Sequence, residues 1–127
     1  MIDNFEEYTH ELTNKELKLI PMIVRGLVTK IGKEMAITNK VMVTKLKVAG
    51  IKVSGPRLRK IIHHIRITGQ VERLIATSKG YYVSNDVEEI KEYIESLEQR
   101  LSSIEFMKYA LEGHLNRLIK LGGRPQR

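Results

Sequence analysis

The 127-residue chain contains no cysteine, no tryptophan and only three prolines. Without cysteine there can be no disulfide framework, thiol nucleophile or thiolate metal site. No apolar run approaches the roughly 18 residues that a membrane-spanning helix needs. The first residues, MIDNFEEYTHEL, are acidic and polar, unlike a signal peptide or a transit peptide. We therefore expect a cytoplasmic protein with no membrane partner.

The sequence also lacks the patterns of catalytic and cofactor sites. It has no glycine-rich phosphate loop and no carboxylate cluster with metal-ligand spacing. His63 and His64 are adjacent, so on a helix they project about 100° apart and cannot chelate one metal ion as an i, i+4 pair would. No acidic residue lies between Arg57 and Glu72 to orient a catalytic histidine. We predict no enzyme activity, no metal site and no cofactor.

Acidic residues are scarce in the middle of the chain, where the positive charge is concentrated. Residues 1–12 carry a net charge of −4, and residues 86–127 a net charge of −1. Residues 13–85 contain fifteen Lys and Arg against three acidic residues, a net charge of +12. Such a block repels itself, and a polyanionic partner is the usual reason to tolerate that repulsion. The alternative is a basic surface that serves only solubility.

The start of this basic stretch has the pattern of a helix. Thr13 and Glu16 have the spacing of a capping box, which predicts a helix start. Apolar residues then recur at spacings of three and four: Leu17, Ile20, Val24, Leu27, Val28 and Ile31. The pattern predicts a first helix over about 14–32, kinked or restarted at Pro21 and stopped by Gly32.

Two further helices are predicted after a very short strand at 35–38. The second covers about 40–48, and the third covers about 55–68, with Ser54 as its cap and Pro56 in its first turn. One face of the third helix is an apolar stripe of Leu58, Ile61, Ile62 and Ile65. The opposite side carries cations and histidines: Arg57, Arg59, Lys60, His63, His64 and Arg66. This helix therefore buries one face and presents a basic one.

Two β-prone runs follow, at 73–76 and 81–83, joined by TSKG. Gly80 in this short connection predicts a β-hairpin. Because side chains alternate along a strand, we expect one of Tyr81 and Tyr82 to pack inward and the other to lie on the surface. Three helices closed by a hairpin are the winged-helix arrangement.

The basic third helix is the predicted DNA-recognition element, since a helix fits the major groove. The predicted DNA contacts are Lys40, Lys47, Ser54, Arg57, Arg59, Lys60, His63, His64, Arg66 and Lys79. We expect the bases to be met by Arg57, Arg59, Lys60 and His64, and the phosphates by Lys40, Lys47, Arg66 and Lys79. Ser54 and the free amides beside it could hold a phosphate. The alternatives are a solvated basic face and, for Lys79, a plain turn residue.

From Asp86 onward a seven-residue repeat predicts a long coiled-coil helix over about 86–121. Its a and d positions are Val87, Ile90, Ile94, Leu97, Leu101, Ile104, Lys108, Leu111, Leu115 and Leu118. A helix of this length, roughly 54 Å, could not hide the stripe against so small a domain. We therefore predict a homodimer. The alternative is a helix folded back on its own domain, with or without a break near residues 102–103.

Residues beside this seam bear on its orientation and on other partners. In a parallel dimer Asp86 would meet Lys91 of the second copy, and Arg100 would meet Glu105, which mildly favours parallel pairing. Phe106 and Tyr109 lie off the seam and could pack against the winged helix, widen the interface beyond two helices or dock a protein partner.

The stretch AITNKVMVTKLKVAGIKVSGPRLRKIIHHIRITGQVERLIATSKGYYVS resembles the winged helix-turn-helix proteins of bacterial phages and mobile elements. The following DVEEIKEYIESLEQRLSSI resembles the helical tail that often trails them. The resemblance implies DNA binding, by a regulator or a replication-origin protein, with residues 54–66 as the recognition helix and 77–80 as the wing tip. The short wing here has one lysine and no arginine, which departs from a strongly basic wing.

Together these patterns predict a mainly α protein: a winged helix-turn-helix domain with three helices and a short β-hairpin, followed by a long coiled-coil helix. The predicted segments are an acidic amino terminus (1–12), the DNA-binding domain (13–85), the dimerisation helix (86–121) and a flexible tail (122–127). The expected function is a homodimeric regulator of transcription that binds double-stranded DNA. The alternatives are a phage replication or recombination accessory protein that recruits a partner, and a winged-helix adaptor that binds no DNA.

Overall fold

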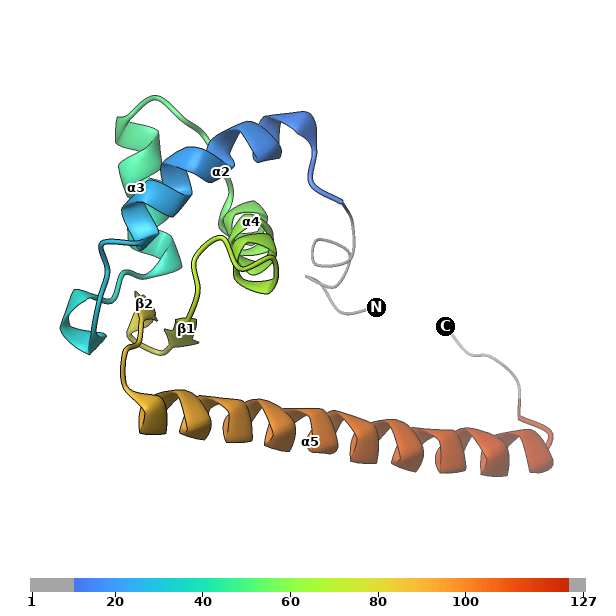
Figure 1. Cartoon of the computed structure of the whole chain (residues 1–127). Helices are drawn as coiled ribbons and strands as arrows, with labels where there is room; N and C mark the ends of the chain where they lie inside the picture. Colours follow the sequence, from blue (N-terminus) through green and yellow to red (C-terminus); the bar gives the residue numbers. More distant parts are fainter. Residues whose placement is uncertain (1–10, 124–127) are drawn as a thin grey trace. The chain divides into compact units, whose positions relative to one another are not determined.

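The computed structural model describes residues 11–123, and the chain divides into two compact units at Ile90 and Lys91. Most of the predicted acidic segment 1–12, and the predicted flexible tail beyond residue 123, lie outside the described residues. The described part is mainly helical (Figure 1). Its elements are α2 (Asn14–Leu27), the 3₁₀ helix η1 (Lys33–Met35), α3 (Asn39–Val48), α4 (Gly55–Ile67), β1 (Leu74–Thr77), β2 (Gly80–Val83) and α5 (Val87–Lys120).

Helix α2 begins at the predicted capping box. The Thr13 hydroxyl accepts a hydrogen bond from the Glu16 amide at 3.2 Å, and the Glu16 carboxylate accepts one from the Thr13 amide at 2.8 Å. The helix continues through Pro21 without restarting. The capping-box prediction is confirmed.

The predicted extension of this helix to residue 32 is wrong, because α2 ends at Leu27. Residues 30–32 pair with the hairpin instead. The Val83 amide donates a hydrogen bond to the Lys30 carbonyl at 2.7 Å, and the Gly32 amide donates to the Val83 carbonyl at 2.9 Å. Backbone pairing with a distant segment thus prevails over the helical spacing of the apolar residues.

The buried side of α2 also differs from the predicted stripe. Ile20 and Leu27 are buried as expected, but Ile23 and Glu16 complete the buried side. Three residues of the predicted stripe are instead exposed: Leu17, Val28 and Ile31. Val28 and Ile31 lie beyond the end of α2 at Leu27, so the helical spacing does not apply to them.

Helix α4 is the centre of the core and packs against both α2 and α3 (Figure 1). The predicted stripe is confirmed, with Leu58, Ile61, Ile62 and Ile65 at most 1% exposed. Burying each of these side chains contributes about 1.5–3 kcal/mol. Ser54 caps the helix as predicted, since its hydroxyl accepts a hydrogen bond from the Arg57 amide at 3.3 Å.

Strands β1 and β2 form an antiparallel hairpin in which Leu74 lies opposite Val83 and Thr77 lies opposite Gly80. The predicted strand at 35–38 is reduced to one bridge, in which Ile37 and Tyr81 exchange backbone hydrogen bonds at 2.8 and 3.0 Å. The residues just before it form η1, so they cannot extend the bridge.

Gly80 is required where this bridge crosses the hairpin. Its φ is +119°, and a Cβ atom there would come within 2.4 Å of the Ile37 carbonyl. No other residue type fits both the backbone angle and the close approach.

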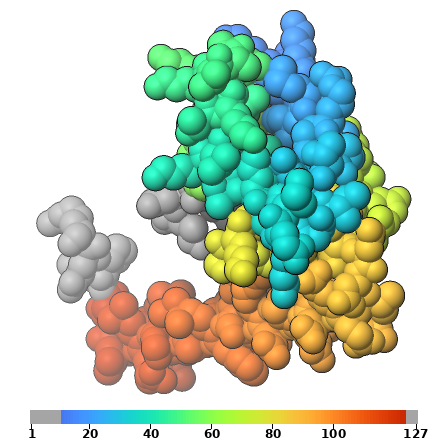
Figure 2. Space-filling view, turned by 90° about the vertical axis from the view of Figure 1, so that its left-hand side faces the viewer, coloured from blue at the N-terminus to red at the C-terminus, as the bar shows by residue number. Residues whose placement is uncertain are grey.

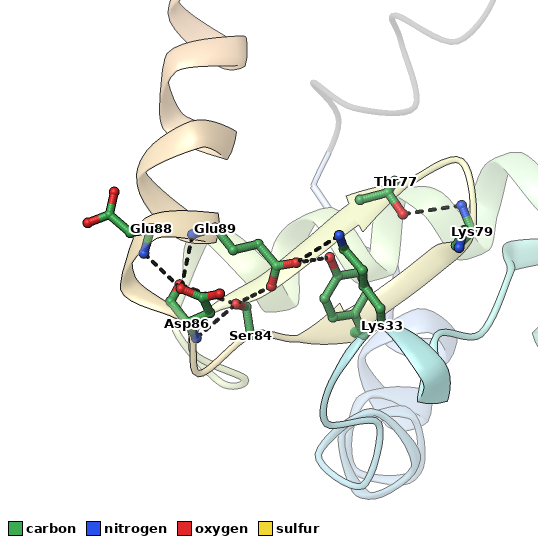
Figure 3. Close-up of polar contacts among 8 residues, drawn as sticks. Lys33, Thr77, Lys79, Ser84, Asp86, Glu88 and Glu89 are labelled. Atoms are coloured by element: carbon green, nitrogen blue, oxygen red, sulfur yellow. Dashed lines mark hydrogen bonds and ion pairs between the residues drawn. The ribbon is translucent and has the colours of Figure 1, made fainter.

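The first turn of α5, which belongs to the first unit, is held by the hairpin and η1 (Figure 3). The Asp86 carboxylate caps the helix by accepting hydrogen bonds from the amides of Glu88 and Glu89. The Glu89 carboxylate accepts hydrogen bonds from the hydroxyls of Tyr82 and Ser84 and lies 3.6 Å from the Lys33 ammonium. These hydrogen bonds keep the pKa of Glu89 below its ordinary value, so the carboxylate stays ionised.

This cluster explains why the expectation for the two tyrosines is wrong: both are buried. Tyr81 joins the hydrophobic core, whereas Tyr82 points to the other face of the hairpin and meets Glu89. Burial and the Glu89 carboxylate raise the pKa of Tyr82 to about 12, so its hydroxyl remains a hydrogen-bond donor at neutral pH.

Helix α5 is one unbroken helix of 34 residues, so the predicted alternative of a break near residues 102–103 is wrong. Figure 2 shows it, from orange to red, as a continuous rod. No residue of α5 is buried. Among its seam residues, Ile90 is half-buried and the others are exposed. No helix within residues 11–123 combines the length and apolarity needed to cross a membrane.

Candidate nucleic-acid interface

The outward face of α4 is a row formed by Arg59, His63 and Ile67, which follow one another at four-residue spacing. Arg59 and His63 are half-buried, and Ile67 is 69% exposed. The sequence prediction missed Ile67, although its phase opposite the buried stripe would have revealed it. An exposed isoleucine beside polar groups can contact the methyl group of thymine.

His63 lies at the centre of this row. Burial, and then electrostatic interaction with the neighbouring Arg66 and His64, lower the pKa of His63 below its ordinary value of 6.5. Its imidazole is therefore neutral at pH 7, and it can both donate and accept a hydrogen bond at a base edge. A neutral ring also adds no charge to this crowded cationic face.

Lys60 does not lie on the exposed face, and the prediction that it does is wrong. Its side chain is only 10% exposed, and its ammonium donates a hydrogen bond to the Glu16 carboxylate at 3.0 Å. The same carboxylate lies 3.8 Å from the guanidinium of Arg57, which remains 57% exposed. Glu16 of α2 therefore holds Lys60, one predicted DNA contact, away from solvent. It also partly neutralises the charge of Arg57, a second predicted contact.

Glu16 is ionised at neutral pH. Burial alone would raise its pKa, but the hydrogen bond from the Thr13 backbone and the adjacent Lys60 ammonium together lower it below the ordinary value. The Glu16 carboxylate therefore links α2 to α4. It accepts one hydrogen bond from the Thr13 amide and another, within a buried ion pair, from the Lys60 ammonium.

Arg66 has a structural contact as well. Its Nε donates a hydrogen bond to the Leu74 carbonyl at 3.2 Å, which ties the last turn of α4 to β1. His64 lies beside it on the same helix and is half-buried. Of the predicted contacts on α4, Arg57 is the one whose side chain is mostly exposed, at 57%.

Helix α3 brings further cations next to the start of α4. The Asn39 side chain donates a hydrogen bond to the Gly55 carbonyl at 3.0 Å, which joins the amino ends of the two helices. The neighbouring Lys40 is exposed, and Lys47 lies two turns further along the same face. Lys45 and Lys52 are also exposed in this region and were not among the predicted contacts.

The hairpin tip lies beside the amino end of α3. A shallow cavity of about 170 Å³ is lined by Thr38 and Asn39 on one side and by Thr77 and Ser78 on the other. Lys79 is exposed at the tip, where its amide donates a hydrogen bond to the Thr77 hydroxyl at 3.2 Å (Figure 3). The start of α4, the start of α3 and the hairpin tip are therefore neighbours, and each presents a cation.

On α5, Lys108 occupies the polar position of the apolar seam. Its ammonium lies 4.0 Å from the Glu112 carboxylate and 5.4 Å from the centre of the Tyr109 ring. Lys108 is thus partnered within its own helix and does not require a counter-charge from elsewhere. Within residues 11–123, no group of three or more His, Asp or Glu side chains could hold a metal ion.

The sequence matches no model of a known protein family and no curated protein, and no solved structure matches the fold.

Proposed function

We propose that the first unit is a winged-helix domain that binds double-stranded DNA. The observation that carries the proposal is the neighbouring set of cations on α4, α3 and the hairpin tip. Only three acidic residues accompany fifteen basic ones in residues 13–85. One of those three, Glu16, is buried. A polyanion is the partner that such a surface fits.

The order of elements supports this class. Helix α2, the Ile37 bridge, α3, α4 and the β1–β2 hairpin follow one another as the helices and strands of a winged helix do. The α3–turn–α4 segment would be the helix-turn-helix, with α4 in the major groove. Arg59 and His63 would face the bases, and Ile67 a thymine methyl group.

The flanking cations would bind the phosphates. These are Lys40 and Lys47 of α3, Arg57 of α4 and Lys79 of the hairpin tip. Each phosphate contact releases counterions from the DNA. About four contacts per subunit make about eight in a dimer. We expect the logarithm of the association constant to fall with the logarithm of salt concentration with a slope of about −7. Fluorescence anisotropy of a labelled duplex measures this slope, and a slope near zero would exclude an electrostatic interface.

The role of Arg59 as a base contact has a separate test. Replacing Arg59 with Ala is expected to cost about 1–3 kcal/mol on the preferred sequence and to relax the preference at one base pair. The matched control is Lys18→Ala, which removes an exposed cation of α2 outside the proposed contacts. Selection of bound duplexes from a random pool measures the sequence preference of both variants. An unchanged preference in Arg59→Ala would mean that Arg59 contacts phosphates and not a base.

We further propose that α5 pairs two copies of the chain. A pair of such helices would cover the exposed a and d side chains from Val87 to Leu118. A cytoplasmic, homodimeric, non-enzymatic regulator of transcription of phage or mobile-element type is the particular function that we propose.

The exposed aromatic residues of α5 favour one second candidate. Phe106 is 72% and Tyr109 57% exposed, and neither belongs to the seam. An accessory protein of replication or recombination would use such a pair to recruit a partner. Loss of a co-purified partner on replacing both residues with Ala, with DNA affinity unchanged, would favour this function over simple regulation.

A further inference from the structure

A pocket of about 180 Å³ lies between α2 and α3, outside the proposed DNA-contacting set. It is lined mainly by apolar side chains, among them Ile23 and Leu27 of α2, Met42 and Leu46 of α3, and Ile37. Figures 1 and 2 both show α2 and α3 next to each other in the first unit. Apolar cavities of about 150 Å³ are large enough to bind one benzene molecule. The space therefore fits one aromatic ring or a chain of about six carbons.

Gly26 borders this pocket from the last turn of α2. A Cβ atom built on it would meet nothing within 4 Å, so the glycine is not needed for packing. Its helical backbone does not need glycine either, since no positive φ is found there. Glycine is the least favourable residue in a helix apart from proline. At position 26 the chain therefore has no side chain that could occupy the α2 side of the pocket.

Two cations line the pocket beside this apolar surface. Lys45 is exposed and Lys30 half-buried, and neither forms an ion pair with a carboxylate of residues 11–123. None of the pocket-lining residues within 11–123 is acidic. The pocket therefore combines an apolar surface with the two ammonium groups of Lys30 and Lys45, whose charge no carboxylate among residues 11–123 balances.

We propose that this pocket binds a small monocarboxylate whose apolar part is an aromatic ring or a chain of about six carbons. The apolar part lies against Met42 and Leu46, and the carboxylate meets the ammonium groups of Lys30 and Lys45. Such a ligand removes apolar surface from water and pairs its single charge at the rim. The site is independent of the proposed DNA binding, since none of its residues belongs to the proposed contacts.

Three probes with the same six-carbon chain separate the contributions of chain and charge: sodium hexanoate, 1-hexanol and hexylammonium chloride. Each is titrated into the ¹⁵N-labelled full chain and followed by NMR. We expect hexanoate to shift the amides of Gly26 and Lys45 with a dissociation constant on the order of 1 mM. Its affinity should exceed that of hexylammonium by about tenfold or more. Equal affinities for the two ions, or no shift at these amides, would overturn the proposal.

Two variants with matched controls localise the binding. Lys30→Ala/Lys45→Ala should weaken hexanoate binding by about tenfold and leave hexanol binding unchanged, whereas Lys18→Ala/Lys52→Ala should change neither. Gly26→Leu should fill the pocket and weaken binding of hexanoate and hexanol alike, while leucine supports the helix better than glycine. Its control is Gly113→Leu, at a helical glycine with similarly open surroundings. Hexanoate binding that survives in both test variants would contradict the site.

Discussion

Replacing Leu97 and Leu101 with glutamate is expected to convert the proposed dimer into monomers and to weaken DNA binding by about 100-fold or more. Both side chains belong to the exposed seam of α5, and in a dimer each would be buried against the second copy. Two glutamates per chain would bring four like charges into that seam, which an apolar interface cannot accommodate. Glutamate is a good helix former, so α5 itself should persist.

The loss of DNA affinity follows from the loss of the second domain. In a dimer, binding of one domain holds the other near its half-site, and this advantage can reach about 10²–10⁴. Analytical ultracentrifugation measures the mass, and anisotropy measures the affinity. The control variant Ser102→Glu/Ser103→Glu places the same charges outside the seam and should remain dimeric. A wild-type monomer, or a dimeric double variant at 97 and 101, would contradict the proposed pairing.

Replacing Glu16 with Ala is expected to lower the free energy of unfolding by about 3 kcal/mol or more. The change would leave the Lys60 ammonium, 10% exposed in its side chain, without its carboxylate partner. It would also remove the acceptor for the Thr13 amide at the start of α2. Urea unfolding followed by circular dichroism measures the loss.

The double variant Glu16→Ala/Lys60→Met distinguishes an unpaired charge from other effects. Removing both charges should restore a large part of the lost stability, because no uncompensated ammonium remains buried. A double variant as unstable as Glu16→Ala would show that the ion pair is not the cause.

The Glu16 carboxylate should also make the free energy of unfolding depend on pH, in a direction that follows from its pKa. The pKa of Glu16 is lower in the folded chain than its ordinary value of 4.5. Its contribution to stability is therefore fully present above the ordinary pKa and is lost as the pH falls through the lowered one. Glu16→Gln lacks this group, so its stability should fall less steeply than that of the wild type below pH 4.5.

Several elements could be predicted from the sequence because a local pattern determines them. The stripe of α4 buries as predicted, and Ser54 caps that helix. The capping box of α2 is present, and the heptads from Asp86 onward correspond to one unbroken helix. Each of these features depends on residues only a few positions apart.

The remaining differences come from contacts between distant segments. Glu16 and Lys60 are 44 positions apart, and no local spacing indicates that they meet. The end of α2 is determined by pairing of residues 30–32 with Val83, which helical spacing does not encode. Tyr82 is buried and its hydroxyl donates a hydrogen bond to Glu89 of α5, whereas strand alternation alone assigns one tyrosine to the surface.

The most direct test of the account is to locate the DNA on the protein. The ¹⁵N-labelled full chain is titrated with a short duplex drawn from the selected sequences, and amide shifts are mapped by NMR. We expect the largest shifts at Arg59, His63 and Ile67, with smaller ones at Lys40 and Lys79. Shifts confined to α5, or none at saturating duplex, would contradict the claim that the exposed face of α4 enters the major groove.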